Sequence, residues 1–297
     1  MDKTSMSYSE VNKIIAQILE VKFQYEANLQ TGTPSGNYFW YRKRKEVADL
    51  ISKNIQLLSS INKDTPSHNF VDVGCGDGLD IFLIKQLFDN YSVKYHYLGL
   101  EGSPASYRIC NLRKEYFNAD NIDFKTVDIT NSLPLDDGSV DLLYCSEVIE
   151  HILNPTGFLK ELRRVIKTGG YFILTTPNEP NIFQKSYWLS NARSKTKALQ
   201  NDLRDNPTKF LINGKEVPIY GHISCRTDTE WDQTLGETGF SLIDYRRGAI
   251  VYGGTPYHDQ DLILGLKFLL ESFLNILPKR LTRSISNQVV ALYQATT

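Results

Sequence analysis

Hydrophobic and polar positions alternate along this chain with the periods of strands and helices in turn. Residues 70–73 form a short apolar run, which is the pattern of a buried parallel strand. Three glycines follow at once, and apolar residues then recur at helical spacing over residues 79–87. The predicted order is strand, glycine turn, helix. In an open α/β sheet, a ligand binds at such a turn, beyond the carboxyl end of the strand.

The alternation continues to the end of the chain and predicts an α/β fold. Further strands are predicted at residues 95–100, 122–127, 140–144, 171–176, 240–245 and 288–293. Helices are predicted at residues 8–29, 47–55, 227–239 and 262–277, and after the capping residues Ser103 and Asn154. We expect residues 1–60 to form an N-terminal helical cap and residues 61–297 to form the main domain.

One connection is longer than this pattern requires. Residues 179–226 are mostly polar, and they leave the edge of the sheet where a substrate must approach. Long connections in compact domains are usually lids or binding loops. We therefore interpret this segment as a substrate-binding or lid insertion.

The charge balance indicates which partners the protein does not need, and the cysteines indicate its redox compartment. The chain has 33 basic and 34 acidic residues, a balance that does not call for nucleic acid or an anionic membrane. The basic run at residues 42–45 is therefore interpreted as a solvated first turn of a helix. The four cysteines form no zinc-type spacing, and the first ten residues are polar, so we expect reduced thiols in a cytoplasmic protein.

The segment 262–277 is the longest apolar stretch. Lys267 and Glu271 interrupt it, and it is short for a membrane span. We expect its apolar face to pack on the core or in a homodimer, because such faces usually meet protein. Contact with a membrane surface is the alternative, since Lys279 and Arg280 follow closely.

The glycine turn itself discriminates between ligands. Counted from Gly74, the last small residue of a dinucleotide fingerprint would be Leu79, so that pattern fails, and no P-loop lysine is present. Asp72 and Asp77 place carboxylates in the turn, which suits a ligand with an ammonium group. The turn resembles the first motif of class I S-adenosylmethionine-dependent methyltransferases. That resemblance implies that the methionine end of the cofactor lies against Asp72, Gly74, Cys75, Gly76 and Gly78.

Residues after the next two strands complete the expected cofactor site. Glu101 lies 23 residues beyond Gly78, near the offset at which an acidic residue binds a ribose in nucleotide-binding α/β folds. The strings from 141 to 178 closely resemble the bacterial type 11/12 group of these enzymes. The resemblance implies a Rossmann-like sheet of seven strands, mostly parallel, with an antiparallel last strand. It also implies cofactor contacts from Arg42 to the carboxylate, from Gly102, Ser103 and Ser146, and from Asp128 and Ile129 to the adenine.

Acidic and histidine residues follow the fourth strand, where an acceptor would meet the cofactor. If residues 147–151 were helical, Glu147 and His151 would share a face. One interpretation is a general base, His151 held by a carboxylate. A second is a divalent metal, such as Mg²⁺, bound by Glu147, Glu150, His151 and His222. This set resembles ubiquinone-pathway and small-RNA 2′-O-methyltransferases. A third is a structural role in shaping the loop.

The sequence thus predicts an S-adenosylmethionine-dependent methyltransferase that methylates an oxygen of a small molecule or sugar. Its predicted catalytic residues are His151, Glu147 and His222. An RNA 2′-O-methyltransferase is an alternative, but the chain has no basic surplus. A cofactor-binding subunit that supports a partner is another, and a nicotinamide oxidoreductase is disfavoured by Leu79.

Overall fold

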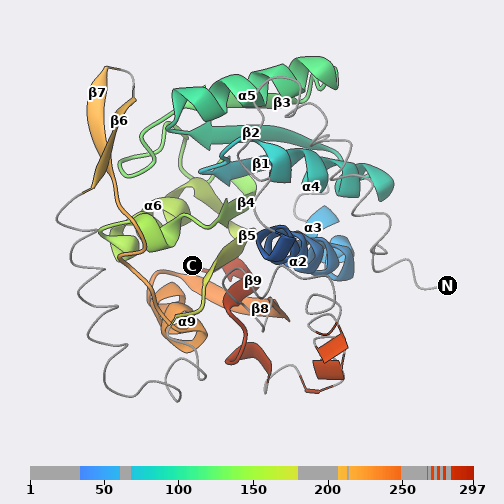
Figure 1. The fold of residues 1–297 in the computed structure, drawn as a ribbon. Helices are drawn as coiled ribbons and strands as arrows, with labels where there is room; N and C mark the ends of the chain where they lie inside the picture. Colours follow the sequence, from blue (N-terminus) through green and yellow to red (C-terminus); the bar gives the residue numbers. More distant parts are fainter. Residues whose placement is uncertain are drawn as a thin grey trace.

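A seven-stranded sheet forms the centre of the molecule (Figure 1). The computed structural model describes residues 34–60, 68–179, 207–212, 214–248 and 282–297, with 266, 269–270, 273–274 and 277–278. The strands are β1 (His68–Val73), β2 (Tyr95–Glu101), β3 (Ile122–Thr126), β4 (Val140–Ser146), β5 (Ile166–Pro177), β8 (Phe240–Arg247) and β9 (Gln288–Ala295). Their order is β3-β2-β1-β4-β5-β9-β8, and β9 runs antiparallel to both of its neighbours. The predicted fold class is confirmed.

Helices cover both faces of this sheet. They are α2 (Pro34–Lys53), α3 (Ile55–Ser59), α4 (Leu79–Asn90), α5 (Pro104–Tyr116), α6 (Pro155–Val165) and α9 (Asp228–Glu237). Successive residues of β1 point to opposite faces, so Phe70 joins one apolar core with α2 and α4, while Val71 joins the other with α6 and α9. The carboxyl ends of the parallel strands are thereby held in one rigid row.

A separate hairpin lies within the segment predicted as a loop. It consists of β6 (Thr208–Ile212) and β7 (Lys215–Ile219), which pair with each other and, within the described ranges, with no strand of the large sheet. Figure 1 shows it beyond the ends of β2 and β3. The sequence analysis did not predict these two five-residue strands, because it interpreted the whole mostly polar segment 179–226 as a loop. Residues 180–206 and 213 lie outside the described residues.

The basic run near the N-terminus is not solvated, so that interpretation was wrong. Helix α2 begins at Pro34, and Arg42, Lys43 and Arg44 are each at most 5% exposed. Their charges are met by two acidic partners, the buried Glu46 and the partly buried Asp80. Buried cations persist only when paired in this way. The helix predicted at 8–29 lies outside the described residues.

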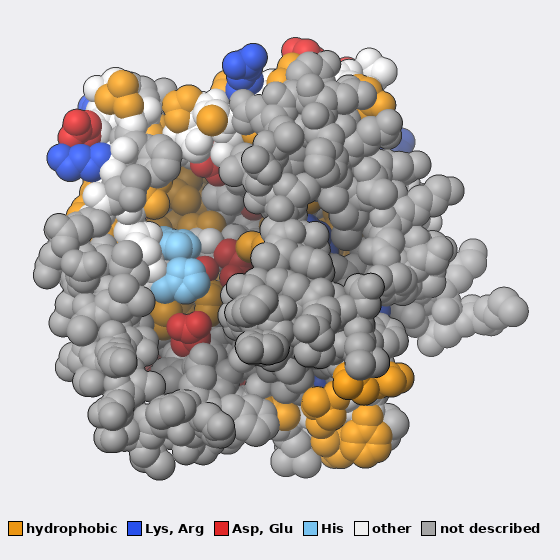
Figure 2. All heavy atoms as spheres, in the orientation of Figure 1, with side chains coloured by type: hydrophobic (Ala, Val, Ile, Leu, Met, Phe, Trp, Pro, Cys, Tyr) orange, Lys and Arg blue, Asp and Glu red, His pale blue; other side chains and the backbone are white. Residues whose placement is uncertain are grey.

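The segment 262–277 is described at only a few positions. Leu266, Leu269, Leu270, Phe273 and Leu277 are 39–64% exposed, so they do not cover the sheet as one interpretation proposed. They form an apolar patch at the lower right of Figure 2. Among the described residues, none of the helices is long and apolar enough to cross a membrane.

Candidate active site

The glycine turn after β1 adopts a backbone that side chains would obstruct. Gly74 has a φ of +78°, and a Cβ there would lie 2.4 Å from Val148 Cγ2. Gly76 has a φ of +56°, and a Cβ there would meet no atom within 4 Å, so it faces open space. Glycine tolerates this left-handed backbone at little cost. The turn therefore forms a tight cradle with one open side.

A cavity of about 270 Å³ lies on that open side. Its lining combines two cations of α2, Lys43 and Arg44, with Asp72 of β1, Asp77 of the turn and Asp80 of α4. The Trp40 ring also lines it, and Lys43 Nζ lies 4.6 Å from the centroid of this ring. Cationic and anionic side chains therefore line the same cavity.

Asp80 anchors α2 to the floor of this cavity. Its carboxylate accepts from Lys43 Nζ at 3.1 Å, Arg44 Nε at 2.7 Å and the Tyr144 hydroxyl at 2.8 Å. Burial by itself would raise the pKa of Asp80, but the two cations outweigh it and hold the pKa well below its usual range. Asp80 is therefore ionised and fully engaged.

Asp72 differs from Asp80 both in its hydrogen bonding and in the direction in which its pKa is shifted. It is 1% exposed, and its Oδ1 atom has no hydrogen-bond partner among the described residues. Burial, with repulsion from Asp80, raises the pKa of Asp72 well above its usual range. An orphaned carboxylate oxygen on a cavity wall is costly unless a positive ligand meets it. The cavity therefore fits a small group with an ammonium.

Glu101 joins the end of β2 to the glycine turn. One carboxylate oxygen accepts from Gly76 N at 2.8 Å and the other from Ser103 N at 2.7 Å. Burial raises the pKa of Glu101, although these amide donors act against it. Both oxygens retain a further lone pair, so a ribose diol could still bind there.

Three other residues predicted to contact the cofactor, Asp128, Ile129 and Arg42, differ in the groups that surround them. Asp128 accepts from Thr130 and Asn131 in its own loop, and Ile129 approaches Gly74. Arg42 pairs with Glu46 at 2.8 Å and does not line the cavity, whereas the next two residues do. Contacts of Arg42, Asp128 and Ile129 with a cofactor stay predictions. The sequence analysis missed Lys43 and Arg44, although both belong to the basic run that it noted.

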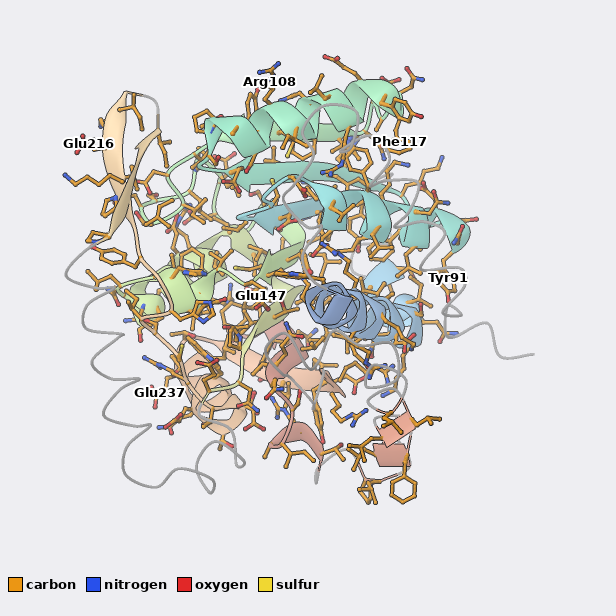
Figure 3. All side chains as sticks on the ribbon, in the orientation of Figure 1. Tyr91, Arg108, Phe117, Glu147, Glu216 and Glu237 are labelled. Atoms are coloured by element: carbon orange, nitrogen blue, oxygen red, sulfur yellow. The ribbon has the colours of Figure 1, made fainter. Side chains whose placement is uncertain are left out.

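Glu147 lies on the wall of the cavity, and it is not helical. It has a φ of +56°, an uncommon value for a residue with a side chain, and it directly follows β4. The condition under which Glu147 and His151 would share one face of a helix is therefore not met, since only Ile149–His151 form a short 3₁₀ turn. Figure 3 shows Glu147 near the middle of the molecule, beside α2.

A continuous chain of hydrogen bonds leads from the cations to Glu147. Lys43 Nζ donates to Ser146 Oγ at 2.7 Å, and Ser146 lies 2.8 Å from Thr175 Oγ1. Thr175 donates to Glu147 Oε1 at 2.9 Å, and Gln288 Nε2 donates to the same oxygen at 3.3 Å. Burial raises the pKa of Glu147, and Lys43 partly opposes this. Glu147 is therefore held in place and is a stronger base than an exposed carboxylate.

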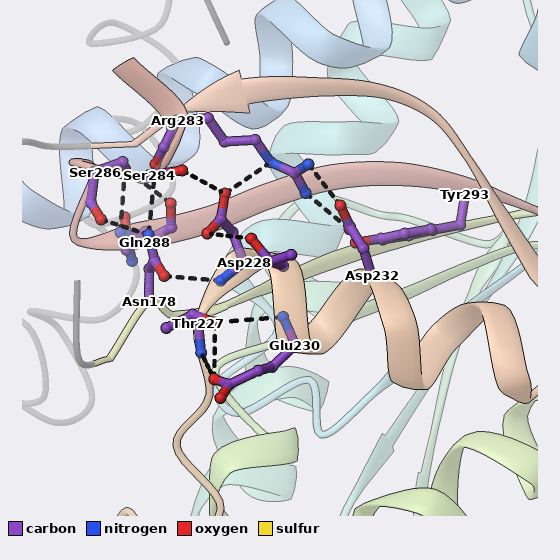
Figure 4. A network of polar contacts seen from close by, with 11 residues as sticks. Asn178, Thr227, Asp228, Glu230, Asp232, Arg283, Ser284, Ser286, Gln288 and Tyr293 are labelled. Atoms are coloured by element: carbon purple, nitrogen blue, oxygen red, sulfur yellow. Dashed lines mark hydrogen bonds and ion pairs between the residues drawn. The ribbon is translucent and has the colours of Figure 1, made fainter. Parts of the chain in front are cut away.

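Gln288 in turn belongs to a polar network at the start of β9 (Figure 4). Its backbone N–H and C=O both bond to Ser286 Oγ. Asn178 donates to the Ser286 carbonyl at 2.9 Å and accepts from Asp228 N at 2.9 Å. Arg283 forms a bidentate pair with Asp232. This network fixes the C-terminal strand and hence the amide beside Glu147.

Three predicted residues, Glu150, His151 and His222, form a second cluster. The nearest ligand-type atoms of Glu150, His151 and His222 lie within 4.8 Å of one another. His151 Nδ1 donates to the Tyr220 carbonyl at 2.8 Å, which leaves Nε2 with its lone pair, 3.8 Å from Glu150 Oε1. Burial lowers the pKa of His151, so the ring is neutral near pH 7. Figure 2 shows imidazoles and carboxylates together in a hollow of this face.

The cluster differs from the predicted ligand set in two ways. Glu147 is not part of it, because its backbone directs the carboxylate to Thr175 and Gln288. Glu179 and Cys225 instead lie within the same range of His222. Their positions follow from the end of β5 and from the segment before α9, and no spacing in the sequence marks them.

The chain was compared with known proteins through a family model and through similar sequences. A family model described as a methyltransferase domain matches residues 64–239. A Mycolicibacterium smegmatis protein, named as a probable S-adenosylmethionine-dependent methyltransferase, is 27% identical over 147 residues, 50% of this chain and 48% of that protein. The ubiquinone biosynthesis O-methyltransferase of Acinetobacter baylyi is 23% identical over 142 residues, 47% and 57% of the two chains.

Solved structures share the fold. The [4+2]-cyclase SpnF superposes with a TM-score of 0.53 at 13% identity, covering 99% of this chain and 97% of that one. The sequence matches, in contrast, span about half the length of the curated relatives. The residues matched by the family model, 64–239, include the glycine turn and the carboxyl ends of β1, β2, β3, β4 and β5.

Proposed function

The chain belongs to the class I methyltransferases that use S-adenosylmethionine, and we propose that it transfers the methyl group to a hydroxyl oxygen of a small molecule or sugar. The relative named as an O-methyltransferase supports oxygen as the acceptor atom. The observation that carries the proposal is the placement of Glu147, a carboxylate with a raised pKa, on the wall of the cofactor cavity.

The cavity residues suit the amino-acid end of the cofactor. S-adenosylmethionine supplies an electrophilic methyl on a sulfonium sulfur, and its other end carries an ammonium and a carboxylate. Asp72 Oδ1 would accept from the ammonium, and Lys43 and Arg44 would hold the carboxylate. The open side of Gly76 leaves room for the ligand backbone. Glu101 would bind the ribose hydroxyls.

An alcohol is a poor nucleophile at neutral pH, so its proton must be removed as the methyl is transferred. Glu147 would accept this proton at its carboxylate. Thr175 and Gln288 hold the carboxylate in a fixed orientation, which lowers the entropic cost of alignment. His151, neutral and fixed by the Tyr220 carbonyl, would orient the acceptor through Nε2, with His222 beside it.

The test is an acceptor screen with product analysis. The protein is incubated with S-adenosylmethionine and a panel of phenols and sugars, and S-adenosylhomocysteine and the methyl ether are measured by mass spectrometry. We expect an O-methyl product that disappears with the deoxy analogue. Glu147→Gln should reduce turnover by about 100-fold or more and leave cofactor affinity within about twofold. A methylated nitrogen or carbon, or an unaffected Glu147→Gln variant, would refute the proposal.

A divalent cation in the second cluster is the other candidate. Glu150 is fully buried, and its Oε1 has no hydrogen-bond partner among the described residues although it faces His151 Nε2. A cation bound by Glu150, His151 and His222 would satisfy that oxygen and could bind an acceptor oxygen. Chelation should then abolish turnover, and Mg²⁺ add-back should restore it. Activity that is indifferent to chelator would exclude the cation.

A further inference from the structure

His222 belongs to a further group of ligand-type side chains, and this group includes a thiol. One ligand-type atom from each of Glu179, His222 and Cys225 lies within 4.8 Å of the other two. We call these three residues the thiol cluster. His222 is exposed, and Glu179 and Cys225 are half-buried, so an ion from solvent can reach all three.

The backbone holds the thiol cluster together by bonds that involve no ligand. On one side, Glu179 N donates to the Arg226 carbonyl at 3.2 Å, which ties the end of β5 to the segment before α9. On the other side, the amides of Ile223 and Ser224 both donate to the Glu150 carbonyl at 2.9 Å. The segment that carries the imidazole and the thiol is therefore fixed on both sides. A site that is already ordered loses less entropy when it binds an ion.

The donor atoms of the thiol cluster are those that bind zinc. Zn²⁺ takes cysteine thiolate, histidine nitrogen and carboxylate oxygen as ligands, usually four in a tetrahedron. Mg²⁺ and Ca²⁺ prefer oxygen, and a thiolate is too soft a ligand for them. We propose that Glu179, His222 and Cys225 bind a Zn²⁺ ion whose fourth ligand is water. Cys225 binds as the thiolate, so its proton passes to solvent and no oxidation takes place.

This ion would join the two ends of the long connection between β5 and α9. Glu179 directly follows the end of β5, whereas His222 and Cys225 lie shortly before α9. The ring centroid of His222 is 5.0 Å from that of His151, so the ion would also fix the imidazole beside His151. None of the three ligands lines the cofactor cavity. The inference therefore does not rest on the proposed function, and its test needs neither cofactor nor acceptor.

The experiment measures how well Zn²⁺ protects Cys225 from alkylation. Cys75, Cys110 and Cys145 are buried, so iodoacetamide should modify Cys225 first in the folded chain, and the other three serve as internal controls. The protein is stripped of metal with a chelator, dialysed and titrated with Zn²⁺ or Mg²⁺. Mass spectrometry of peptides gives the alkylation rate at each cysteine. Zn²⁺ should slow alkylation of Cys225 by about tenfold or more, because the attacking electron pair is then bound to the metal, whereas Mg²⁺ should change it by less than about twofold.

Two variants of nearly unchanged shape locate the ion. Glu179→Gln removes the charged ligand of the thiol cluster, and the matched control Glu150→Gln does the same in the second cluster. Glu179→Gln should raise the Zn²⁺ concentration needed for half protection by about 100-fold, since the loss of even an outer partner of a ligand costs about 10- to 100-fold in metal affinity. Glu150→Gln should stay within about threefold. Should it not fold, His151→Gln replaces it, because it also removes a ligand of the second cluster alone.

Every other result overturns the inference. If Zn²⁺ does not protect Cys225 in the unaltered chain, the site does not exist. If protection is undiminished in Glu179→Gln, the thiol binds zinc without this carboxylate, and the three-ligand site is wrong. If protection is lost in Glu150→Gln but kept in Glu179→Gln, the ion belongs to the second cluster.

Co²⁺ provides a second readout, which does not depend on alkylation. Bound in place of Zn²⁺, it should give the near-ultraviolet charge-transfer band of a thiolate ligand in the unaltered chain. The band should be absent from Cys225→Ser, which should keep the native circular dichroism. A band of equal strength in Cys225→Ser would contradict the assignment of this thiolate as a ligand.

Discussion

Replacing Asp80 by asparagine tests how α2 is fixed over the cofactor cavity. Lys43 and Arg44 are 3% and 6% exposed at their side chains, and both donate to the Asp80 carboxylate. The asparagine has nearly the same shape but no charge, so it would leave two buried cations uncompensated. Removing one partner of a buried ion pair costs about 3–5 kcal/mol of folding free energy.

The expected shift in melting temperature follows from the size of the protein. For chains of this size, each kcal/mol changes the melting temperature by about 2–4 °C, so Asp80→Asn should melt about 10 °C lower. The matched control is Asp89→Asn on the same helix. Asp89 is 45% exposed and pairs with Lys85 one turn away, a contact that contributes about 0.5 kcal/mol or less. Calorimetry at pH 7 without cofactor measures both.

The pH dependence gives the decisive signature. The pKa of Asp80 is lower in the folded state than its unfolded value of 3.8. Its stabilisation is therefore complete above that pH and is lost as the pH falls towards the folded pKa. The deficit of Asp80→Asn should shrink below pH 3.8. If the variant melts within 2 °C of Asp89→Asn at pH 7, or if its deficit does not change with pH, the ion-pair reasoning is wrong.

Three further predictions concern the site itself. Glu101→Gln should weaken S-adenosylhomocysteine about 10- to 100-fold in calorimetry, because the amide turns one acceptor into a donor beside Gly76 or Ser103; unchanged affinity would remove Glu101 from the ribose site. Gly74→Ala should lower the free energy of unfolding by about 2 kcal/mol or more, owing to its positive φ and the clash with Val148, whereas Gly236→Ala in α9, with open space around it, should not destabilise. Turnover should rise with pH through the raised pKa of Glu147 and then level off, and an acid limb at the ordinary value of 4.5 would contradict this assignment.

Much of the cofactor side could be predicted from consecutive residues. The glycine turn, the acidic residue that ends β2 and the strand positions all appear in local patterns, and the structure places the turn and Glu101 side by side at one edge of the sheet. Strand ends were less predictable, since β5 begins at Ile166 rather than near Tyr171. Its first residues continue directly from the last residue of α6.

The acceptor side could not be predicted in the same way. Glu147, Glu150 and His151 are close in sequence, yet the Glu147 carboxylate bonds to Thr175 and Gln288 and is not part of the cluster that Glu150 and His151 form with His222. Glu179 and Cys225 approach His222 because the end of β5 and the segment before α9 lie side by side, paired by a bridge at Asn178.

The amino-acid sequence by itself determined the alternation of strands and helices, the glycine turn and the fold family, because period and backbone conformation depend on neighbouring residues. Only the tertiary structure decided which charges share the site. Lys43 meets Asp80 across 37 residues and Ser146 across 103, and Gln288 meets Glu147 across 141. The packing of the chain determines these partners. A buried charged or polar group is stable only beside a complementary group, and the fold decides which groups are adjacent.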